Sequence, residues 1–388
     1  MTNEILKRLD AYLDGYFKKN NWKLETCSKC GKAYFSKKNS LDCGRYACQQ
    51  KYTFLSLPKR KNFVFLEELL DKTNCFFNQQ YKIVNGKSII NERGDTLFTT
   101  AGVQCLDKII YENAEIPKEP FFIAQPSLRV QNLEKIGKTE GSSTSFVNIC
   151  TEEINCSIEN HIKHIDSWLR YLSRIGLFVS DMNIVKSDGW RGGNLKGSNI
   201  LVEYGGLELG DVVYIYDIPQ EKRTNLTISD SGFGLERICW ALNKNESYFE
   251  IIGPLNVALK KKEKLIDFVR SLTLMAGFGV GPSNKSRGYR FRQFAKKSIE
   301  EGSIEEIDYL LPYFYNFWNK VTPLTRPFEE TKEEIRKEIN RNFNLSFCKK
   351  IGTKPPEEII DKDNSTLIEY LIKRGMKLNN LKDILNKK

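Results

Sequence analysis

The segment Asp230-Ser-Gly-Phe-Gly-Leu-Glu-Arg237 constrains this chain more than any other. It follows the apolar residues 226–228, so the pattern predicts a strand, a turn softened by two glycines, and a helix with an arginine on its first turn. Such an element offers a carboxylate for an ammonium group, close backbone approach at the glycines, and a guanidinium for phosphates. A ligand with both an amino group and a polyphosphate would use all three. The simpler alternative is an ordinary strand-to-helix turn with Glu236 and Arg237 in solvent.

Length and composition indicate an ordinary globular protein. The chain has 388 residues, 40% of them hydrophobic and 28% charged, which suits two or three domains with a sizeable core. Its apolar runs are too short to cross a bilayer. The charged segment Met1–Tyr16 spaces Leu6, Leu9 and Leu13 like an amphipathic helix and does not resemble a signal peptide. We therefore expect a cytoplasmic protein with no membrane partner.

The formal charge of +11 favours polyanions as partners, although a lysine-rich surface without a partner would give the same sum. The distribution of charge is more informative. Residues 251–300 hold eleven Lys or Arg, Lys260 and Lys261 among them, against three acidic residues. Tyr289 and Phe291 alternate with the second half of this cluster, as on surfaces that bind nucleic-acid backbones.

Ten cysteines in an apparently cytosolic chain argue against a disulfide framework. Four of them have the spacing of zinc ligands, with a glycine after the second and after the third: Cys27, Cys30, Cys43 and Cys48. The spacing predicts a tetrahedral zinc site, and the alternative is a degenerate site with free thiols. The other cysteines are expected to be small core residues. No third ligand is apparent near His161 and His164, so both are expected to be surface or hydrogen-bonded residues.

The order of the elements divides the chain into three parts. Strands are expected at 95–100, 121–124, 145–149, 201–204 and 211–216, and helices at the N-terminus, from residue 65, and over 154–176. From Leu242 onward the pattern is nearly all helical. We therefore expect an N-terminal helix and four-cysteine module in residues 1–60, a strand-rich domain in 61–245, and a helical domain in 246–388.

Several motifs resemble those of the alanyl-tRNA synthetases, a family of class II aminoacyl-tRNA synthetases. Residues 230–237 are similar to the family's "DTGxGLER" form of motif 3, and residues 97–102 to "LFTNAGM". Gln125-Pro-Ser-Leu-Arg129 through Gly137-Lys-Thr139 resembles the motif 2 region. The four cysteines look like the N-terminal zinc module of the archaeal-type enzyme. Together these motifs cover most of the chain.

Further matches extend the resemblance into both halves of the chain. Trp190 with Gly192-Gly-Asn194 is similar to the "W…GGGN" loop that lines the alanine pocket in the family, and residues 207–216 to "GLELATLVFM". Residues 281–292 resemble "xPSNxxxGYxxR" of the tRNA-recognition domain. The resemblance implies an α+β fold, namely a class II synthetase antiparallel sheet flanked by helices, with an N-terminal zinc module and a C-terminal helical tRNA-recognition domain.

The resemblance also implies roles for individual residues. Catalytic residues would be Arg129, Asp230 and Arg237, with Arg129, Arg237 and Glu236 on ATP. The small amino acid would be held by Trp190, Asn194, Asp230 and Gly232. The tRNA acceptor stem would be bound by Asn284, Arg287, Tyr289 and Arg292. The implied cofactors are ATP, Mg²⁺ and a structural Zn²⁺. Arg129 would stabilise charge on the α-phosphate while the carboxylate attacks it.

Other positions depart from the family's pattern. The return strand of motif 2, Gly141–Ile149, lacks an Arg-His pair and has Val147 where the family has a glutamate. Asn132 replaces an aspartate, Leu201 a glutamate, and Ile372 the aspartate that partners the tRNA-reading asparagine. The sequence also stops where the family's editing and C-terminal domains begin. We therefore expect no editing in cis, and correction of a mischarged product would fall to a separate editing protein.

Three hypotheses remain open at this point. The first is a ligase that forms an adenylate from ATP and alanine, or another small amino acid, and transfers the acyl group to tRNA. The second is an amino-acid ligase paralogue that acylates a small molecule or a carrier protein. The third is a non-catalytic, tRNA-binding relative of a synthetase.

Overall fold

The computed structural model describes residues 2–131, 133–138, 141–218, 226–254 and 262–377. Asn132, Thr139, Lys260 and Lys261, which are named above, lie outside the described residues. The chain divides into two compact units. The sheet unit comprises Met1–Ser127, Glu140–Ser142 and Phe146–Gly253, and the helical unit comprises Leu128–Thr139, Ser143–Ser145 and Pro254–Lys388.

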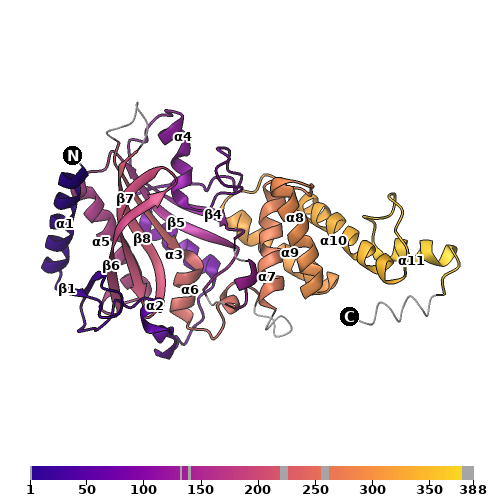
Figure 1. Cartoon of the computed structure of the whole chain (residues 1–388), viewed down its shortest axis with the longest axis horizontal. Coiled ribbons are helices and arrows are strands. Elements are labelled where there is room, and N and C mark those ends of the chain that lie inside the picture. The colour runs from indigo at the N-terminus through magenta and orange to yellow at the C-terminus, as the bar shows by residue number, and fades with distance from the viewer. Residues whose placement is uncertain (1, 132, 139–140, 219–225, 255–261, 378–388) are drawn as a thin grey trace. The chain divides into compact units, whose positions relative to one another are not determined.

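In the described residues, the strands form one nine-stranded sheet in the order β1-β2-β6-β7-β8-β9-β5-β4-β3 (Figure 1). The strands are β1 Lys23–Thr26, β2 Ala33–Ser36, β3 Lys82–Val84, β4 Phe121–Leu128, β5 Ser145–Ile154, β6 Met182–Gly192, β7 Leu195–Tyr204, β8 Leu207–Asp217 and β9 Ile228–Gly234. The neighbours from β1 to β9 and from β9 to β5 pair antiparallel, whereas β3 pairs with β4 in parallel. The predicted α+β fold with an antiparallel sheet flanked by helices is confirmed.

The helices of the sheet unit pack against this sheet. They are α1 Thr2–Lys19, α2 Tyr46–Gln49, α3 Leu66–Phe77, α4 Asp107–Tyr111, α5 Ile158–Ile175 and α6 Leu235–Asn243. Helix α1 buries Leu9 and Leu13, which confirms the amphipathic pattern, and lies along α5, where Tyr16 donates a 2.7 Å hydrogen bond to Asp166 (Figure 1). Helix α5 begins at a serine cap, since the Ser157 hydroxyl accepts from the Asn160 N–H.

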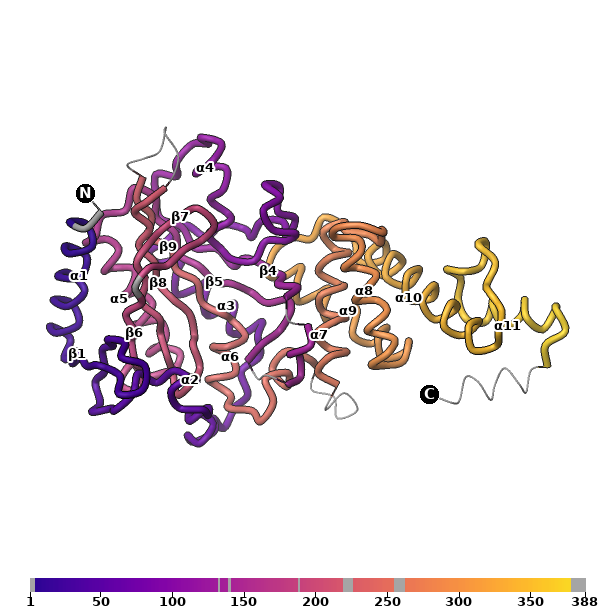
Figure 2. The backbone as a smooth tube through the Cα atoms, viewed as in Figure 1, coloured from indigo at the N-terminus to yellow at the C-terminus, as the bar shows by residue number. Residues whose placement is uncertain are grey.

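The helical unit contains α7 Glu263–Gly277, α8 Ser286–Glu301, α9 Ile304–Val321, α10 Phe328–Lys350 and α11 Asn364–Lys373 (Figure 2). Nearly every residue of α7 is buried, and α8, α9 and α10 all pack against it. A capping box between Ser303 and Glu306 begins α9. The prediction that helices dominate the chain after Leu242 is therefore correct.

Some expected elements differ in the structure. The segment 95–100 is not a strand, because its only ladder contact is an isolated bridge between Phe98 and Ile90. Strand β6 was not expected at all. Strands β7 and β8 are longer than predicted, but they are neighbours joined through Gly205-Gly206, as expected. Both glycines have positive φ, +52° and +92°, as a tight hairpin turn requires.

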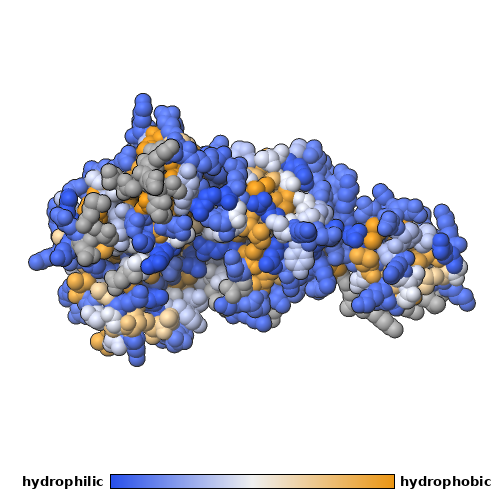
Figure 3. Space-filling model, turned by 45° about the horizontal axis from the view of Figure 1, so that its top comes forward, coloured by the Kyte–Doolittle hydropathy of each residue, from blue (hydrophilic) through white to orange (hydrophobic). Residues whose placement is uncertain are grey.

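Hydrophilic residues cover most of the visible surface in Figure 3, and apolar residues form separate patches. Within the described residues, the helices are all too short or too polar to cross a membrane.

Candidate functional site

Strand β9 and helix α6 form the segment that the sequence singled out. The strand runs through both glycines, and α6 begins directly at Leu235, so the expected separate turn is absent. A methyl group added at Gly232 would lie 3.3 Å from Asn148 Nδ2 and 3.5 Å from Asp211 Oδ1. Gly232 therefore keeps a narrow space open among polar side chains.

Asp230 lies in the middle of β9 and is only 6% exposed. Its neighbours across the sheet are Val213 on β8 and Glu152 on β5. Burial raises the pKa of Asp230 to about 6, and the interaction with the Glu152 carboxyl offsets part of that rise. Cys150, Glu152 and Asp230 bring one sulfur and two carboxylate oxygens within 4.8 Å of one another. Sequence analysis assigned no role to Glu152.

Polar side chains also occupy the neighbouring positions. Asn148 Oδ1 accepts a 2.7 Å hydrogen bond from the Gly102 N–H, and its Nδ2 donates to the Phe233 carbonyl. Asn199 Nδ2 on β7 donates to Asp211 Oδ2 on β8 at 3.0 Å. Val147 stands where the motif 2 glutamate of the family is expected. In the structure, its neighbour Asn148 is the residue whose side chain lies beside Gly102 and Gly232, and no sequence motif marked it.

Glu236 and Arg237 follow at the start of α6. Glu236 is buried, and both of its carboxylate oxygens lie 3.1 Å from the Val147 N–H, which donates to them. This contact fixes α6 to β5. Arg237 donates from Nε to the Gly141 carbonyl at 3.2 Å and from Nη1 to the Glu208 carbonyl at 3.0 Å. The guanidinium is thus held in place while its side chain remains 37% exposed, so the alternative of two freely solvated side chains is wrong.

Trp190 and Asn194 lie on the β6–β7 hairpin. The Trp190 ring packs against the apolar cluster that includes Cys150, Leu195 and Val213. A Cβ at Gly192 would lie 2.4 Å from this ring, so only glycine fits there. Asn194 is exposed in the turn of the hairpin, between Gly192 and Leu195. The structure brings Trp190, but not the exposed Asn194, to the cluster that contains Cys150.

Arg129 directly follows β4 and belongs to the helical unit. Its backbone N–H donates to the Thr144 carbonyl at 2.8 Å, and the residue is exposed. Upstream in the same motif, the Gln125 amide accepts from the Lys87 N–H and donates to the Lys87 carbonyl. The side chain of Gln125, the glutamine of motif 2, thus forms two hydrogen bonds with the backbone of Lys87.

The four predicted zinc ligands come together. Sγ–Sγ distances are 3.8 Å for Cys27–Cys48 and Cys30–Cys43, and 3.7 Å for Cys43–Cys48. A tetrahedron of Zn–S bonds of about 2.3 Å has edges of roughly 3.8 Å, so the thiols fit a zinc ion. Gly31 and Gly44 turn the two loops with φ of +72° and +78°.

The four thiols differ in how readily they lose a proton: burial raises the pKa of Cys48 to about 11 and also raises that of Cys43, whereas Cys27 is shifted the other way. Burial alone would raise the pKa of the Cys27 thiol, but backbone N–H groups of Cys30, Lys29 and Cys43 lower it to about 6. The module is not separate from the sheet, because β2 pairs with β6 between its loops and the rest of the sheet unit.

The remaining cysteines and the histidines have mixed outcomes. Four cysteines are buried as expected, but Cys105 is only partly buried and Cys75 is exposed, so the core prediction is wrong for Cys75. Both histidines are buried and hydrogen-bonded. His161 Nδ1 lies 2.8 Å from Ser229 Oγ, and His164 Nε2 lies 2.8 Å from Glu153 Oε2. Burial lowers the pKa of His161 to about 3.

The residues expected to bind RNA lie just before and along the first half of α8, but Phe291, which the sequence pattern groups with this surface cluster, is fully buried. Asn284 is exposed and accepts a hydrogen bond from Arg292, and Tyr289 is 52% exposed. A Cβ at Gly288 would lie 2.2 Å from Ser283 Oγ, so this glycine lets the preceding loop approach the helix. Lys285, Tyr289, Arg292 and Lys296 follow one another at helical spacing.

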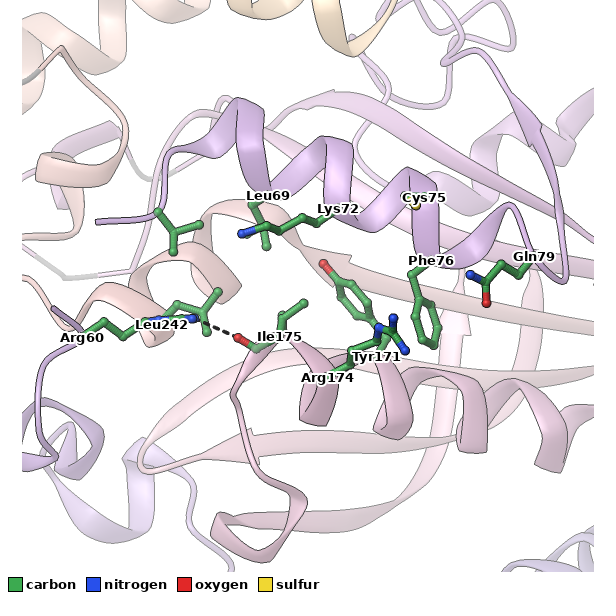
Figure 4. Close-up of a pocket in the computed structure, with 11 residues that line it drawn as sticks. Arg60, Leu69, Lys72, Cys75, Phe76, Gln79, Tyr171, Arg174, Ile175 and Leu242 are labelled. Carbon is green, nitrogen blue, oxygen red and sulfur yellow. Dashed lines mark hydrogen bonds between the residues drawn. The ribbon is translucent and has the colours of Figure 1, made fainter. Parts of the chain in front are cut away.

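A cavity of about 320 Å³ lies between α3, α5 and α6 (Figure 4). Lys72, Tyr171 and Arg174 surround it, and Arg60 donates a 2.8 Å hydrogen bond to the Ile175 carbonyl at its edge. None of the catalytic, ligand-binding or metal-binding residues predicted from the sequence line this cavity.

Comparisons with known proteins identify relatives of the chain. No family model matches it. Alanine–tRNA ligase of Methanoregula boonei is 26% identical over 337 residues, covering 78% of this chain and 36% of that protein. Alanine–tRNA ligase of Picrophilus torridus is 27% identical, and the match covers 61% of this chain and 29% of that protein. Alanine–tRNA ligase of Ignicoccus hospitalis is 24% identical, and the match covers 67% of this chain and 31% of that protein. The chain thus spans about a third of the length of these relatives.

A solved structure of pyrrolysyl-tRNA synthetase from Desulfitobacterium hafniense matches with a TM-score of 0.36 and 16% identity, over 48% of this chain and 72% of that one. The relatives place the chain among homologues of the aminoacyl-tRNA synthetases. More closely, it is a homologue of the archaeal alanine–tRNA ligases over more than half of its length.

Proposed function

We propose that the chain is an aminoacyl-tRNA synthetase-like ligase that forms an aminoacyl-adenylate from ATP and alanine, or another small amino acid. The acyl group then passes to the 3′ end of a tRNA. The observation that carries the proposal is Asp230, a nearly buried carboxylate on a sheet face beside Gly232, Asn148 and the Trp190 cluster. A buried carboxylate next to apolar side chains binds an ammonium group well, because burial is costly for a charge unless an opposite charge pairs with it.

The reaction requires little covalent chemistry from the protein. A carboxylate oxygen of the amino acid attacks the α-phosphorus of ATP, a new P–O bond forms, and the bond to the β-phosphate bridging oxygen breaks to release pyrophosphate. Mg²⁺ would accompany ATP and neutralise phosphate charge. The protein's task is to orient the reactants and to stabilise the developing charge.

Individual residues would divide this task. Asp230 would hold the α-ammonium, and Trp190 would form an apolar wall for a small side chain. Arg237 is held by two backbone carbonyls and lies 3.8 Å from a Glu208 carboxylate oxygen, and it would bind phosphates through the part of its guanidinium that stays exposed. Glu236 would act on ATP only through Arg237 and α6, because its own carboxylate is bound to the Val147 N–H. Arg129 is assigned to the α-phosphate from the resemblance.

Two further assignments complete the proposal. Zn²⁺ would occupy the four thiolates and have a structural role, since Cys27, Cys30, Cys43 and Cys48 leave no ligand position for a substrate. The acceptor would be a tRNA acceptor stem, bound by the exposed Asn284 and Tyr289 and the half-buried Arg287 and Arg292. Exposed basic and aromatic side chains on one helix support this choice of acceptor.

Pyrophosphate–ATP exchange across the twenty amino acids tests the proposal. We expect exchange with at least one small amino acid. Asp230→Asn and Arg237→Ala should each reduce it by roughly two orders of magnitude or more, because each removes a charge-assisted contact. The exposed Asp217 and Arg170 provide matched controls, and Asp217→Asn and Arg170→Ala should exchange normally. Unchanged exchange in both site variants would refute the site assignment, and no exchange with any amino acid would refute adenylation.

A further inference from the structure

Glu152 has no explanation in the fold. It is completely buried on β5, and within the described part of the chain no donor group lies within hydrogen-bond distance of either carboxylate oxygen when it is ionised. The one group that can pair with it is the Asp230 carboxyl, and that hydrogen bond needs a proton on one of the two. Leaving a buried polar group without a partner costs about 1–3 kcal/mol, and more when the group is charged. Such groups are rare in folded proteins, and each one calls for a specific reason.

The surroundings of Glu152 show which ligand would satisfy it. Its direct neighbour on β9 is Asp230, the proposed ammonium seat. The neighbouring side chains on this face belong to an apolar cluster that includes Cys150, Ile154 and Ile228. Because Glu152 pairs directly with Asp230 and their carboxylate oxygens lie within 4.8 Å of each other, one small ligand can contact both carboxyls.

We propose that Glu152 sets the amino-acid specificity of the site by accepting a hydrogen bond from the substrate side chain while Asp230 holds the α-ammonium. The substrate class is then a small amino acid with a hydroxyl or amino group on Cβ, such as serine or 2,3-diaminopropionate. This inference rests on the proposed function, since it names the substrate of the same site.

The separation of the Asp230 and Glu152 carboxyls suits a small molecule that carries two neighbouring hydrogen-bond donors. The α-nitrogen and a heteroatom on Cβ of an amino acid are separated by about 3 Å in a gauche rotamer. The carboxylate oxygens of Asp230 and Glu152 lie within 4.8 Å of each other. Two neighbouring donors can therefore meet two neighbouring acceptors, and neither carboxyl has to move far.

Alanine satisfies only half of this arrangement. Its methyl group would leave both Glu152 oxygens without a partner in a closed, apolar surrounding. Sites built to bind a substrate hydroxyl or amine reject analogues that lack it far more strongly than apolar pockets reject an extra group. The orphaned carboxyl is thus a source of discrimination against alanine.

A metal ion is the competing occupant, because Cys150 supplies a third ligand atom near the two carboxyls. The packing of Cys150 argues against it. A Cβ at Gly102 would lie 2.1 Å from Cys150 Sγ, so the sulfur is packed directly against that backbone, and it donates to the Asn148 carbonyl at 3.6 Å. These contacts already place the thiol, whereas the Glu152 oxygens have no such partners.

The test compares exchange kinetics for alanine, serine and 2,3-diaminopropionate. The wild-type chain should favour a donor-bearing amino acid over alanine by at least about tenfold in kcat/KM, and Glu152→Met should reduce that ratio at least about tenfold. Glu152→Gln provides a nearly isosteric second variant if the methionine variant does not fold. Glu153→Gln is the matched control, because Glu153 follows on the same strand but points to the opposite face, and it should leave the ratio unchanged.

The outcomes separate this inference from the proposed function. Exchange that favours alanine, with a ratio insensitive to Glu152, overturns the inference and leaves the function intact. If no amino acid supports exchange, calorimetric binding of serine and 2,3-diaminopropionate without ATP still decides the inference: binding that Glu152→Met abolishes supports it, and no binding overturns it. A second bound metal per chain that Glu152→Gln removes would also overturn it, in favour of a metal site.

Discussion

Two adjacent glutamates on β5 show how differently the two faces of the sheet treat polar side chains. Glu153 points towards α5, where its carboxylate accepts from Asn160 Nδ2 at 2.8 Å and pairs with His164 Nε2 at 2.8 Å. Glu152 points to the opposite face and has no hydrogen-bond donor within reach among the described residues. The chain therefore supplies hydrogen-bond donors to the Glu153 carboxylate but none to the Glu152 carboxylate in its described part.

The same contrast extends along both faces. Where α5 packs on the sheet, its Trp168 Nε1 donates to Thr151 Oγ1 at 3.0 Å and to Ser231 Oγ at 2.8 Å, and in the described part of the chain each of these three side chains has a hydrogen-bond partner. On the other face, Asn199 Oδ1 is buried without a partner in the described part of the chain. A closed polar network fixes one core arrangement, whereas open acceptors lower stability unless a ligand meets them. The difference is the reason that the proposed site lies on the face of Glu152 and Asn199.

The four-cysteine cluster is the strongest case of groups that await a ligand, and its metal should have the largest effect. We expect chelation, or Cys43→Ser, to destabilise the sheet unit by several kcal/mol, since structural zinc sites bind with an apparent free energy of about 10 kcal/mol or more. Because β2 pairs with β6, the loss should reach beyond the first ~60 residues. Metal analysis and hydrogen exchange of β6 measure this. Cys75→Ser, at an exposed cysteine, should change neither.

Zinc-free protein with unchanged exchange protection in β6 would contradict this expectation. It would mean that the thiols are simply reduced cysteines and that the module is held by the β2–β6 pairing alone.

The closed network below α5 predicts the next largest effect. Trp168 is fully buried and its ring stacks on Phe233 at 4.0 Å between centroids. Trp168→Ala should destabilise the sheet unit by about 3–5 kcal/mol in urea unfolding, because it opens a cavity and removes one donor from each of two buried hydroxyls, Thr151 and Ser231. The exposed Phe178 is the control, and Phe178→Ala should cost less than about 0.5 kcal/mol. A loss below about 1 kcal/mol for Trp168→Ala would mean that the network contributes little.

Much of this architecture could be predicted from the sequence, for physical reasons. The spacing of Cys27, Cys30, Cys43 and Cys48 is local, and local spacing already fixes a four-thiolate cluster. Amphipathic periods likewise located α1 and α5. In contrast, β6 carries Lys186, Asp188 and a bulge near Trp190, and this interrupts the alternation that marks a strand.

The contrast between Glu152 and Glu153 could not be predicted. Strand β5 is buried on both faces, so its sequence has no alternation of apolar and polar residues from which to infer the inward side. A shift of one residue exchanges the two faces, so the sequence also gives no sign that Asn148 is the residue whose side chain lies beside Gly232. The strand pairing in the structure shows that Glu152, and not Glu153, lies beside Asp230.

The smallest predicted effect is the pH dependence of stability, and it distinguishes the two glutamates directly. Replacing Glu152 and replacing Glu153 should change the free energy of unfolding in opposite directions. Burial and then the charge of Asp230 raise the pKa of Glu152 well above its ordinary value of 4.5. Burial alone would also raise the pKa of Glu153, but hydrogen bonds from His164 and Asn160 outweigh it and hold that pKa below 4.5. A raised carboxyl pKa costs stability as the pH rises above 4.5, whereas a lowered one contributes stability above 4.5 that is lost as the pH falls below it.

Urea unfolding of Glu152→Gln and Glu153→Gln between pH 4 and pH 8 tests this. At pH 8 we expect Glu152→Gln to stabilise the unliganded chain by about 1 kcal/mol, since it removes the cost of ionising or protonating an orphaned carboxyl, and Glu153→Gln to destabilise it by about 1–2 kcal/mol. Both differences should shrink towards pH 4, where the carboxyls of the unfolded chain become protonated. If both variants are destabilised equally at pH 8, Glu152 has a partner in solution, and the two faces of β5 do not differ in the way that its burial indicates.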